Sequence, residues 1–195
     1  MFPAVLVVGA AQQNASGQQM METDDVNILA AHIRDKGYCR IGVDGTNGAG
    51  KSTMAGALAR TLGLCHLNLD DYLVKKQGGF LDHLKYDDIK QKTTELGCFV
   101  IDGVCLLSVL EIIETPVDCL VYVKRMCHGL WADEDECDVT EDVEDYIRTE
   151  RETVRLIEGS ETTPDTLGLA EEIIRYHDKY KPHRKAELFY TREDC

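Results

Sequence analysis

Nine consecutive residues combine three glycines, a lysine and three hydroxyl side chains in a spacing that can bind phosphate. They are Gly45, Thr46, Asn47, Gly48, Ala49, Gly50, Lys51, Ser52 and Thr53. They fit G-x-x-x-x-G-K-[ST], the pattern of a phosphate-binding P-loop. The glycines let the backbone approach phosphate oxygens, so that its N–H groups can point at them. Lys51 would reach the outer phosphates, and the Ser52 hydroxyl would bind Mg²⁺.

The residues on either side of this loop predict the setting that such a loop needs. Residues 39–44 are typical of a short strand, and residues 54–62 are typical of a helix. The motif is informative only between a strand and a helix. The alternative, a glycine-rich turn that matches by chance, is therefore the weaker interpretation.

Acidic residues follow the next two predicted strands. Asp70 and Asp71 close a strand over residues 65–69, and Asp102 closes one over residues 98–101. Asp102 lies where an acid could hold Mg²⁺, directly or through water. One of the two adjacent acids could take the proton of an attacking hydroxyl, while the other is structural. The alternatives are a turn-forming Asp-Gly at Asp102, and a helix cap or solvated turn at Asp70 and Asp71.

Strands that alternate with helices predict an α/β fold. We expect a P-loop NTPase-type, three-layer α/β/α domain with a central parallel sheet of about five strands. Residues 1–22 form a flexible or extra-strand N-terminal segment, and residues 23–195 form a single domain with a lid region near 124–150. The acceptor segment, residues 73–86, is predicted to be a mobile loop. Further helices are expected at 23–36, 87–96, 104–114, 143–157 and 169–179, and further strands at 117–123 and 186–190.

Charge and cysteine content narrow the classes of partner. The 195 residues include 21 Lys and Arg against 35 Asp and Glu, a net charge of −14. Such a balance disfavours duplex nucleic acid and anionic membranes, while a nucleotide can still be bound locally. The eight cysteines include no C-x-x-C pair, so we interpret them as reduced thiols of a cytoplasmic protein. No apolar run is long enough to span a bilayer, and a homo-oligomer is left open.

Several segments, taken in order, resemble a known family. Ile41 to Gly45 with the P-loop looks like the family's opening, and Leu69 to Leu73 resembles its Q-D-[DS]-[FY]-[FY] segment. Val100 to Gly103 is similar to I-[IV]-E-G with Asp in place of Glu. Tyr176 to Glu187 resembles the Y-H-x-x-Y-x-P…A-[DE] ending of bacterial members. The family is that of the uridine kinase-like P-loop kinases, which includes uridine-cytidine kinase, nicotinamide riboside kinase, phosphoribulokinase and bacterial pantothenate kinase.

This resemblance implies an ATP- and Mg²⁺-dependent phosphotransferase with an alcohol group as acceptor. The γ-phosphate would pass to a hydroxyl of a nucleoside-like or other small metabolite, and Asp70 would be the general base. The family usually has an arginine-rich lid, whereas this chain has Lys124 and Arg125 followed by a run of acids. Arg125 is the best catalytic lid candidate. Further candidates are Arg148, Arg151 and Arg155, which would share a helix face or simply pair with nearby acids.

Two other functions fit part of the pattern. A nucleotide-binding switch or slow NTPase acting through a protein partner would suit the sparse lid and the acidic surface. A degenerate family member could bind ATP only structurally, although Lys51, Ser52 and Asp102 are intact. Three other features have structural interpretations: Trp131 is expected to anchor a loop, His177 to be packed, and the acids of residues 133–145 to form a solvated face.

Overall fold

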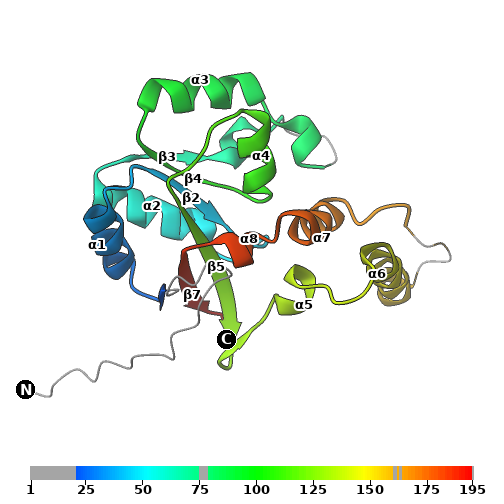
Figure 1. The fold of residues 1–195 in the computed structure, drawn as a ribbon. Coiled ribbons are helices and arrows are strands. Elements are labelled where there is room, and N and C mark those ends of the chain that lie inside the picture. The colour runs from blue at the N-terminus through cyan, green and yellow to red at the C-terminus, as the bar shows by residue number, and fades with distance from the viewer. Residues whose placement is uncertain (1–20, 75–78, 160–161, 163, 195) are drawn as a thin grey trace, which may run out of the picture.

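The structure is a computed structural model that describes residues 21–74, 79–159, 162 and 164–194 (Figure 1). Most of the predicted N-terminal segment, and Lys75 and Lys76 of the acceptor segment, lie outside the described residues. Strands and helices alternate along the chain, as predicted. In order they are β1 (Met21–Thr23), α1 (Val26–Lys36), β2 (Arg40–Asp44), α2 (Lys51–Leu62), β3 (Cys65–Asn68), the 3₁₀ helices η1 (Leu69–Tyr72) and η2 (Leu81–His83), α3 (Tyr86–Leu96), β4 (Phe99–Asp102), α4 (Leu106–Ile112), β5 (Cys119–Cys127), β6 (Leu130–Trp131), α5 (Glu134–Cys137), α6 (Val143–Glu158), α7 (Leu169–Tyr180), α8 (Pro182–Lys185) and β7 (Leu188–Glu193).

One sheet runs through the described part of the chain in the order β1-β7-β5-β2-β4-β3, and β6 pairs with β5. All pairs are parallel except the antiparallel hairpin of β5 and β6. Val43 of β2 lies opposite Asp102 of β4, which in turn lies opposite Asn68 of β3. The carboxyl ends of these three strands therefore meet at one edge of the sheet, which is where ligands bind in open α/β sheets.

Helices cover both faces of the sheet, as Figure 1 shows. Consecutive strand residues point to opposite faces, and the core divides in the same way. Val100 and Val121 pack with α1 and α2 in one hydrophobic cluster, whereas Ile101 and Leu120 pack with α3, α4 and α7 in the other. A mostly parallel sheet buried on both faces is the expected α/β arrangement, consistent with a three-layer α/β/α fold.

In the described part of the chain the sheet has seven strands, more than the five or so that were predicted. The five predicted strands correspond to β2, β3, β4, β5 and β7. The additional strands β1 and β6 have only three and two residues, which is too short for a recognisable alternation of apolar and polar residues. Strand β1 pairs in parallel with β7, so the last residues of the N-terminal segment extend the sheet. The four-residue helices α5 and α8 were not predicted either.

The segment between β3 and α3 is more regular than predicted. Strand β3 ends at Asn68, whose side-chain oxygen accepts a hydrogen bond from the Asp70 N–H at 2.9 Å and so caps η1. The predicted loop 73–86 contains η2, and Leu73 and Leu84 form an isolated antiparallel bridge. Asp70 and Asp71 therefore lie on a tight helical turn and not at the end of an extended strand.

The cysteines are not all in the same state. Cys127 is disulfide-bonded, whereas six other cysteines of the described residues are free. The prediction that all eight are reduced is therefore wrong for Cys127.

Among the helices of the described segments, none has the length and apolar character needed to cross a bilayer.

Candidate phosphate-binding site

The glycine-rich loop connects β2, in the middle of the sheet, to the first turn of α2. A Cβ at Gly45 would lie 2.7 Å from the carbonyl oxygen of Val123, so no larger residue fits there. Gly50 is the N-cap of α2 and has φ +92°, a conformation that favours glycine. Ala49 is fully buried in the core cluster below the loop. The loop is thus anchored from below, while the N-terminus of α2 points out of it.

A cleft of about 540 Å³ lies at this edge of the sheet. It brings together the glycine-rich loop and the two acids that the sequence placed at neighbouring strand ends, Asp70 and Asp102. Of the nine predicted loop residues, Gly45, Thr46 and Ala49 do not line the cleft. The lining residues are Asn47, Gly48, Gly50, Lys51, Ser52, Thr53, Asp70, Leu73, Phe80, Asp102, Gly103, Val104 and Leu169.

Among the described residues that line the cleft, Lys51 is the one with a cationic side chain. Its side chain is almost fully buried and donates a hydrogen bond from Nζ to the carbonyl oxygen of Thr46 at 2.6 Å. Burial lowers the pKa of Lys51, and the carboxylates of Asp44 and Asp102 oppose that shift. The ammonium group is therefore held by the Thr46 carbonyl oxygen and stabilised by the charge of nearby acids.

Asp102 and Ser52 present two oxygen ligands side by side. The Ser52 hydroxyl donates to Oδ2 of Asp102 at 2.7 Å, and Asn68 Nδ2 lies 3.4 Å from the same hydroxyl. His66 Nε2 lies 2.5 Å from the other carboxylate oxygen, Oδ1. Asp102 is fully buried, so its orientation is fixed on both sides. Hydroxyl and carboxylate oxygens are suitable ligands for Mg²⁺.

Asp70 and Asp71 differ in position although they are adjacent. Both side chains are exposed, but only that of Asp70 lines the cleft. The pKa of Asp70 is raised, first by burial and then by the neighbouring charge of Asp102. A raised pKa makes a carboxylate a better proton acceptor near neutral pH. This arrangement fits the expectation that one acid faces the site and the other does not.

A second buried acid, Asp44, lies directly below the loop. Its carboxylate accepts hydrogen bonds from the Gly45 N–H at 2.8 Å and from the hydroxyl of Tyr176. The same hydroxyl accepts a hydrogen bond from the Leu107 N–H at 3.0 Å. Burial raises the pKa of Asp44 to about 6, although both hydrogen bonds and Lys51 act in the opposite direction. Helix α7 is thereby connected to the base of the loop.

Arg125, the predicted lid residue, does not line the cleft. Its guanidinium donates to Asp133, and a second nitrogen lies 4.0 Å from Asp194. Asp133 is 2 % exposed and also accepts a hydrogen bond from the Thr46 hydroxyl at 2.8 Å. The predicted solvated face of acids is therefore wrong for Asp133, which joins Arg125 to the second residue of the loop.

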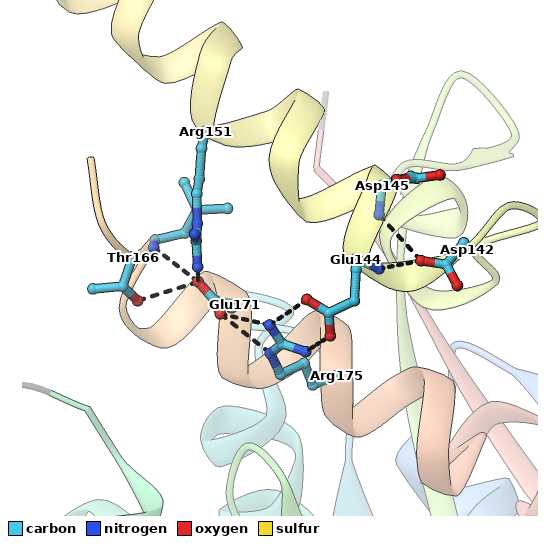
Figure 2. A network of polar contacts seen from close by, with 8 residues as sticks. Asp142, Glu144, Asp145, Arg151, Thr166, Glu171 and Arg175 are labelled. Atoms are coloured by element: carbon cyan, nitrogen blue, oxygen red, sulfur yellow. Dashed lines mark hydrogen bonds and ion pairs between the residues drawn. The ribbon is translucent and has the colours of Figure 1, made fainter. Parts of the chain in front are cut away.

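The other lid candidates are also ion-paired. Figure 2 shows Arg151 of α6 donating to Glu171 of α7, and Arg175 donating to both Glu171 and Glu144. The distance from Arg151 to Glu171 is 2.6 Å. Burial of Glu171 would raise its pKa, but the hydrogen bonds from Arg151 and Arg175 outweigh burial and lower the pKa to about 2. Arg148 pairs with Asp145 and Arg155 with Glu152. The helix-face arginines thus lie in ion pairs, as the structural alternative predicted.

Two aromatic residues singled out in the sequence are packed in the core. His177 is 1 % exposed, with Nε2 at 2.8 Å from the Tyr122 hydroxyl and Nδ1 at 2.8 Å from the carbonyl oxygen of Ile173. Trp131 lies edge-on to Tyr122, with 5.8 Å between ring centroids, and packs against the core. Neither residue lines the cleft.

Sequence reasoning missed three residues next to the site. His66 and Asn68 alternate with apolar residues on β3, a pattern that indicates a strand but not a contact with Asp102 or Ser52. Asp133 lay within a run of acids that looked uniform. Only tertiary structure distinguishes these side chains from their neighbours, because each bonds to a residue at least 16 positions away.

No protein-family model matches the chain, and no curated protein matches it either. Within the described ranges, no group of three or more His, Cys, Asp or Glu side chains is arranged to hold a metal ion. The functional interpretation therefore depends on the residues around the cleft.

Proposed function

We propose that this protein is an ATP- and Mg²⁺-dependent kinase with a P-loop NTPase-type fold. It would transfer the γ-phosphate of ATP to a hydroxyl group of a nucleoside-like or other small metabolite. We further propose that it belongs with the uridine kinase-like enzymes and acts in the cytoplasm, where ATP is available. One observation carries the proposal: the glycine-rich loop, Asp70 and Asp102 line the same cleft. In the sequence these residues belong to three separate segments.

The residues present fit a magnesium ion that is shared with a nucleotide. Mg²⁺ is usually bound by one or two protein side chains, with water and substrate phosphates completing the octahedron. Ser52 and Asp102 would be those side chains, since their oxygens lie 2.7 Å apart and Ser52 lies in the first turn of α2 beside the loop. Held there, Mg²⁺ would supply positive charge that offsets the negative charge of the phosphates.

The chain's own groups have separable roles in the transfer. The loop N–H groups and Lys51 would bind the phosphates and stabilise negative charge that develops on them. Asp70 would orient the acceptor hydroxyl and take its proton as the new oxygen–phosphorus bond forms. The bond from the γ-phosphorus to the oxygen shared with the β-phosphate breaks, and ADP leaves. His66 and Asn68 would keep Asp102 and Ser52 in position.

The proposal is tested by phosphate transfer from ATP across a panel of nucleosides, vitamins and sugars, using wild type and two adjacent variants. Asp70→Asn should lower transfer by about 10²- to 10⁴-fold while nucleotide binding is retained. Asp71→Asn is the matched control, because Asp71 does not line the cleft, and it should retain activity. A fully active Asp70→Asn enzyme would refute the base assignment, and transfer to no acceptor would count against the kinase function.

A second function is favoured by one observation, the ion pairing of the lid arginines. Arg125, Arg148, Arg151 and Arg155 all pair with acids, and none lines the cleft. A nucleotide-binding switch or slow NTPase would need no arginine clamp of its own. ATP hydrolysis that rises with a protein partner, and with no metabolite of the panel, would support this alternative.

A further inference from the structure

Two free thiols lie side by side at the amino ends of two neighbouring strands, away from the cleft. Strands β2 and β4 are parallel, and Arg40 at the start of β2 lies opposite Phe99 at the start of β4. Cys39 and Cys98 each come one residue earlier, so the same register places them opposite each other. The Phe99 N–H donates to the Cys39 carbonyl oxygen at 2.8 Å, which continues the pairing to this point. Both cysteines are free.

The backbone holds the two side chains close enough to form a bond. Neighbouring strands lie about 4.8 Å apart, and a disulfide joins residues whose Cα atoms are roughly 4.4–6.8 Å apart. The thiols of Cys39 and Cys98 are hydrogen-bonded to each other, so they already face one another. Asp118 fixes the chain here, because its Oδ2 accepts hydrogen bonds from the N–H groups of Cys39, at 3.1 Å, and Arg40, at 2.9 Å. An S–S bond therefore requires rotation of side chains and little movement of the strands.

The surroundings of the two thiols favour oxidation in two steps. Cys98 is exposed and Cys39 is half-buried, so an oxidant in solution meets Cys98 first. The hydrogen bond with Cys98, and then burial, raise the pKa of Cys39 to about 11. Cys39 therefore keeps its proton at neutral pH and is suited to react with an oxidised Cys98, not with the oxidant itself. In contrast, Cys105, Cys119 and Cys137 are buried thiols whose pKa is raised by burial, and such thiols are inert.

We propose that Cys39 and Cys98 form a modification site, at which a peroxide converts the two thiols into a disulfide between β2 and β4. The Cys98 sulfur attacks the O–O bond of hydrogen peroxide and becomes a sulfenic acid, and one water molecule leaves with the thiol proton. The Cys39 sulfur then attacks the Cys98 sulfur, an S–S bond replaces the S–O bond, and a second water molecule leaves. Two thiols and one hydrogen peroxide thus give one disulfide and two water molecules. A thiol reductant reverses the modification by thiol–disulfide exchange.

The disulfide would close a loop that contains most of the candidate site. The glycine-rich loop, Ser52 and Asp70 lie between the two cysteines in the sequence, and Asp102 follows Cys98 on β4. Closing a loop of about 60 residues restricts the unfolded chain and so stabilises the folded one. The bond forms at the amino ends of the strands, whereas the cleft lies at their carboxyl ends. Oxidation should therefore raise stability and leave the cleft open.

Peptide mapping tests the site in the full-length protein. The protein is treated with hydrogen peroxide, remaining thiols are alkylated, and a digest made without reductant is analysed by mass spectrometry. The Cys39–Cys98 peptide pair should exceed sulfinic acid at Cys98 by at least about tenfold, because the adjacent thiol reacts intramolecularly. Cys65 is the matched control: it is exposed like Cys98, but it lies opposite Phe99 and so points to the other face of the sheet. It should be oxidised without joining this pair.

Variants of the cysteines connect the disulfide to stability. Oxidised wild type should melt about 5 °C or more above the reduced protein, and dithiothreitol should reverse the rise. Cys98→Ser should lose this rise, whereas Cys65→Ser should keep it. In Cys39→Ser, the sulfenic acid of Cys98 should accumulate and be trapped by dimedone. Dithiothreitol can also reduce the disulfide of Cys127, so the rise is measured as the difference between wild type and Cys98→Ser.

Three results would overturn this assignment. They are sulfinic acid at Cys98 while Cys39 stays a free thiol, a disulfide from Cys98 to a second molecule on a non-reducing gel, and an equal rise in melting temperature in Cys98→Ser. The site is independent of the kinase function, because no step of the oxidation involves a nucleotide. A protein that transfers no phosphate would still form the Cys39–Cys98 disulfide.

Discussion

The cleft and the α5–α7 region differ in how their charged side chains are arranged. At the cleft, Lys51, Asp70 and Asp102 converge on open space from three segments of the chain. In the α5–α7 region, arginines and acids pair with each other, as Arg151, Glu171 and Arg175 do in Figure 2. Charged side chains that converge on the open space of a cleft are candidates for a functional site, and burial there lowers the pKa of Lys51 and raises that of Asp70. Charges that pair at a surface contribute modest stability and little else.

The largest expected effect is at Lys51. Lys51→Met removes the only cation among the described lining residues and should lower phosphate transfer by about a thousandfold. Lys92→Met, on the exposed face of α3, should have no comparable effect. Transfer within a factor of ten of wild type, measured with saturating ATP, would mean that the cleft is not the reaction centre.

The next effect concerns the buried Asp44 and its pKa. In the folded protein this pKa is raised from 3.8 to about 6, so the native state keeps a proton that the unfolded state has already lost. Stability contributed by the protonated carboxyl is complete below pH 3.8 and is lost as the pH rises to 6. The loss should be about 3 kcal/mol. Urea unfolding of wild type and Asp44→Asn over this range should show the additional slope in wild type alone.

Asp133 connects the two regions, and its removal should lower the stability of the folded protein. Asp133→Ala leaves the Thr46 hydroxyl and the Arg125 guanidinium without their buried acceptor, which should cost about 2 kcal/mol, or roughly 5 °C in melting temperature. Asp135→Ala, two residues further on an exposed position of α5, should change the melting temperature little. Equal effects of the two variants would show that the contact with the loop is unimportant.

His66 should influence metal binding through Asp102. His66→Ala frees one oxygen of the Asp102 carboxylate and should weaken Mg²⁺ or Mn²⁺ binding in the presence of a nucleotide by about tenfold, since partners of ligating residues hold those residues in orientation. Calorimetry or Mn²⁺ resonance would measure the affinity. His32→Ala, on α1, serves as the control. Unchanged metal affinity would assign His66 a packing role only.

The smallest effect is expected at Arg151. Arg151→Ala breaks the ion pair with Glu171 and should reduce stability by less than about 1 kcal/mol, with phosphate transfer changed by no more than roughly threefold. Chemical denaturation and the transfer assay measure the two quantities. A hundredfold loss of phosphate transfer would contradict the distinction between the two regions, because it would mean that Arg151 contacts the transferred phosphate.

Local sequence patterns were sufficient to predict the structure around the glycine-rich loop, which is one half of the candidate site. Residues 39–62 contain a strand, a glycine-rich loop and a helix whose boundaries follow from apolar runs and glycine positions. Asp102 could be placed because a parallel sheet brings its strand ends to one edge. The contacts of Asp133 and His66 could not be predicted, since they depend on how distant segments pack. Strands of two or three residues, such as β1 and β6, carry no periodicity from which to predict them.

Helix α7 contacts both ends of the cleft with a single face. Leu169, Glu172 and Tyr176 are three and four residues apart and therefore lie along one side of the helix. Leu169 lines the cleft, Glu172 binds the backbone at Phe80 and Leu81, and Tyr176 binds Asp44 below the glycine-rich loop. A rigid shift of this helix would move both ends together. If binding at one end shifted the helix, it would alter the other end, and by thermodynamic reciprocity the coupling would have the same strength in both directions.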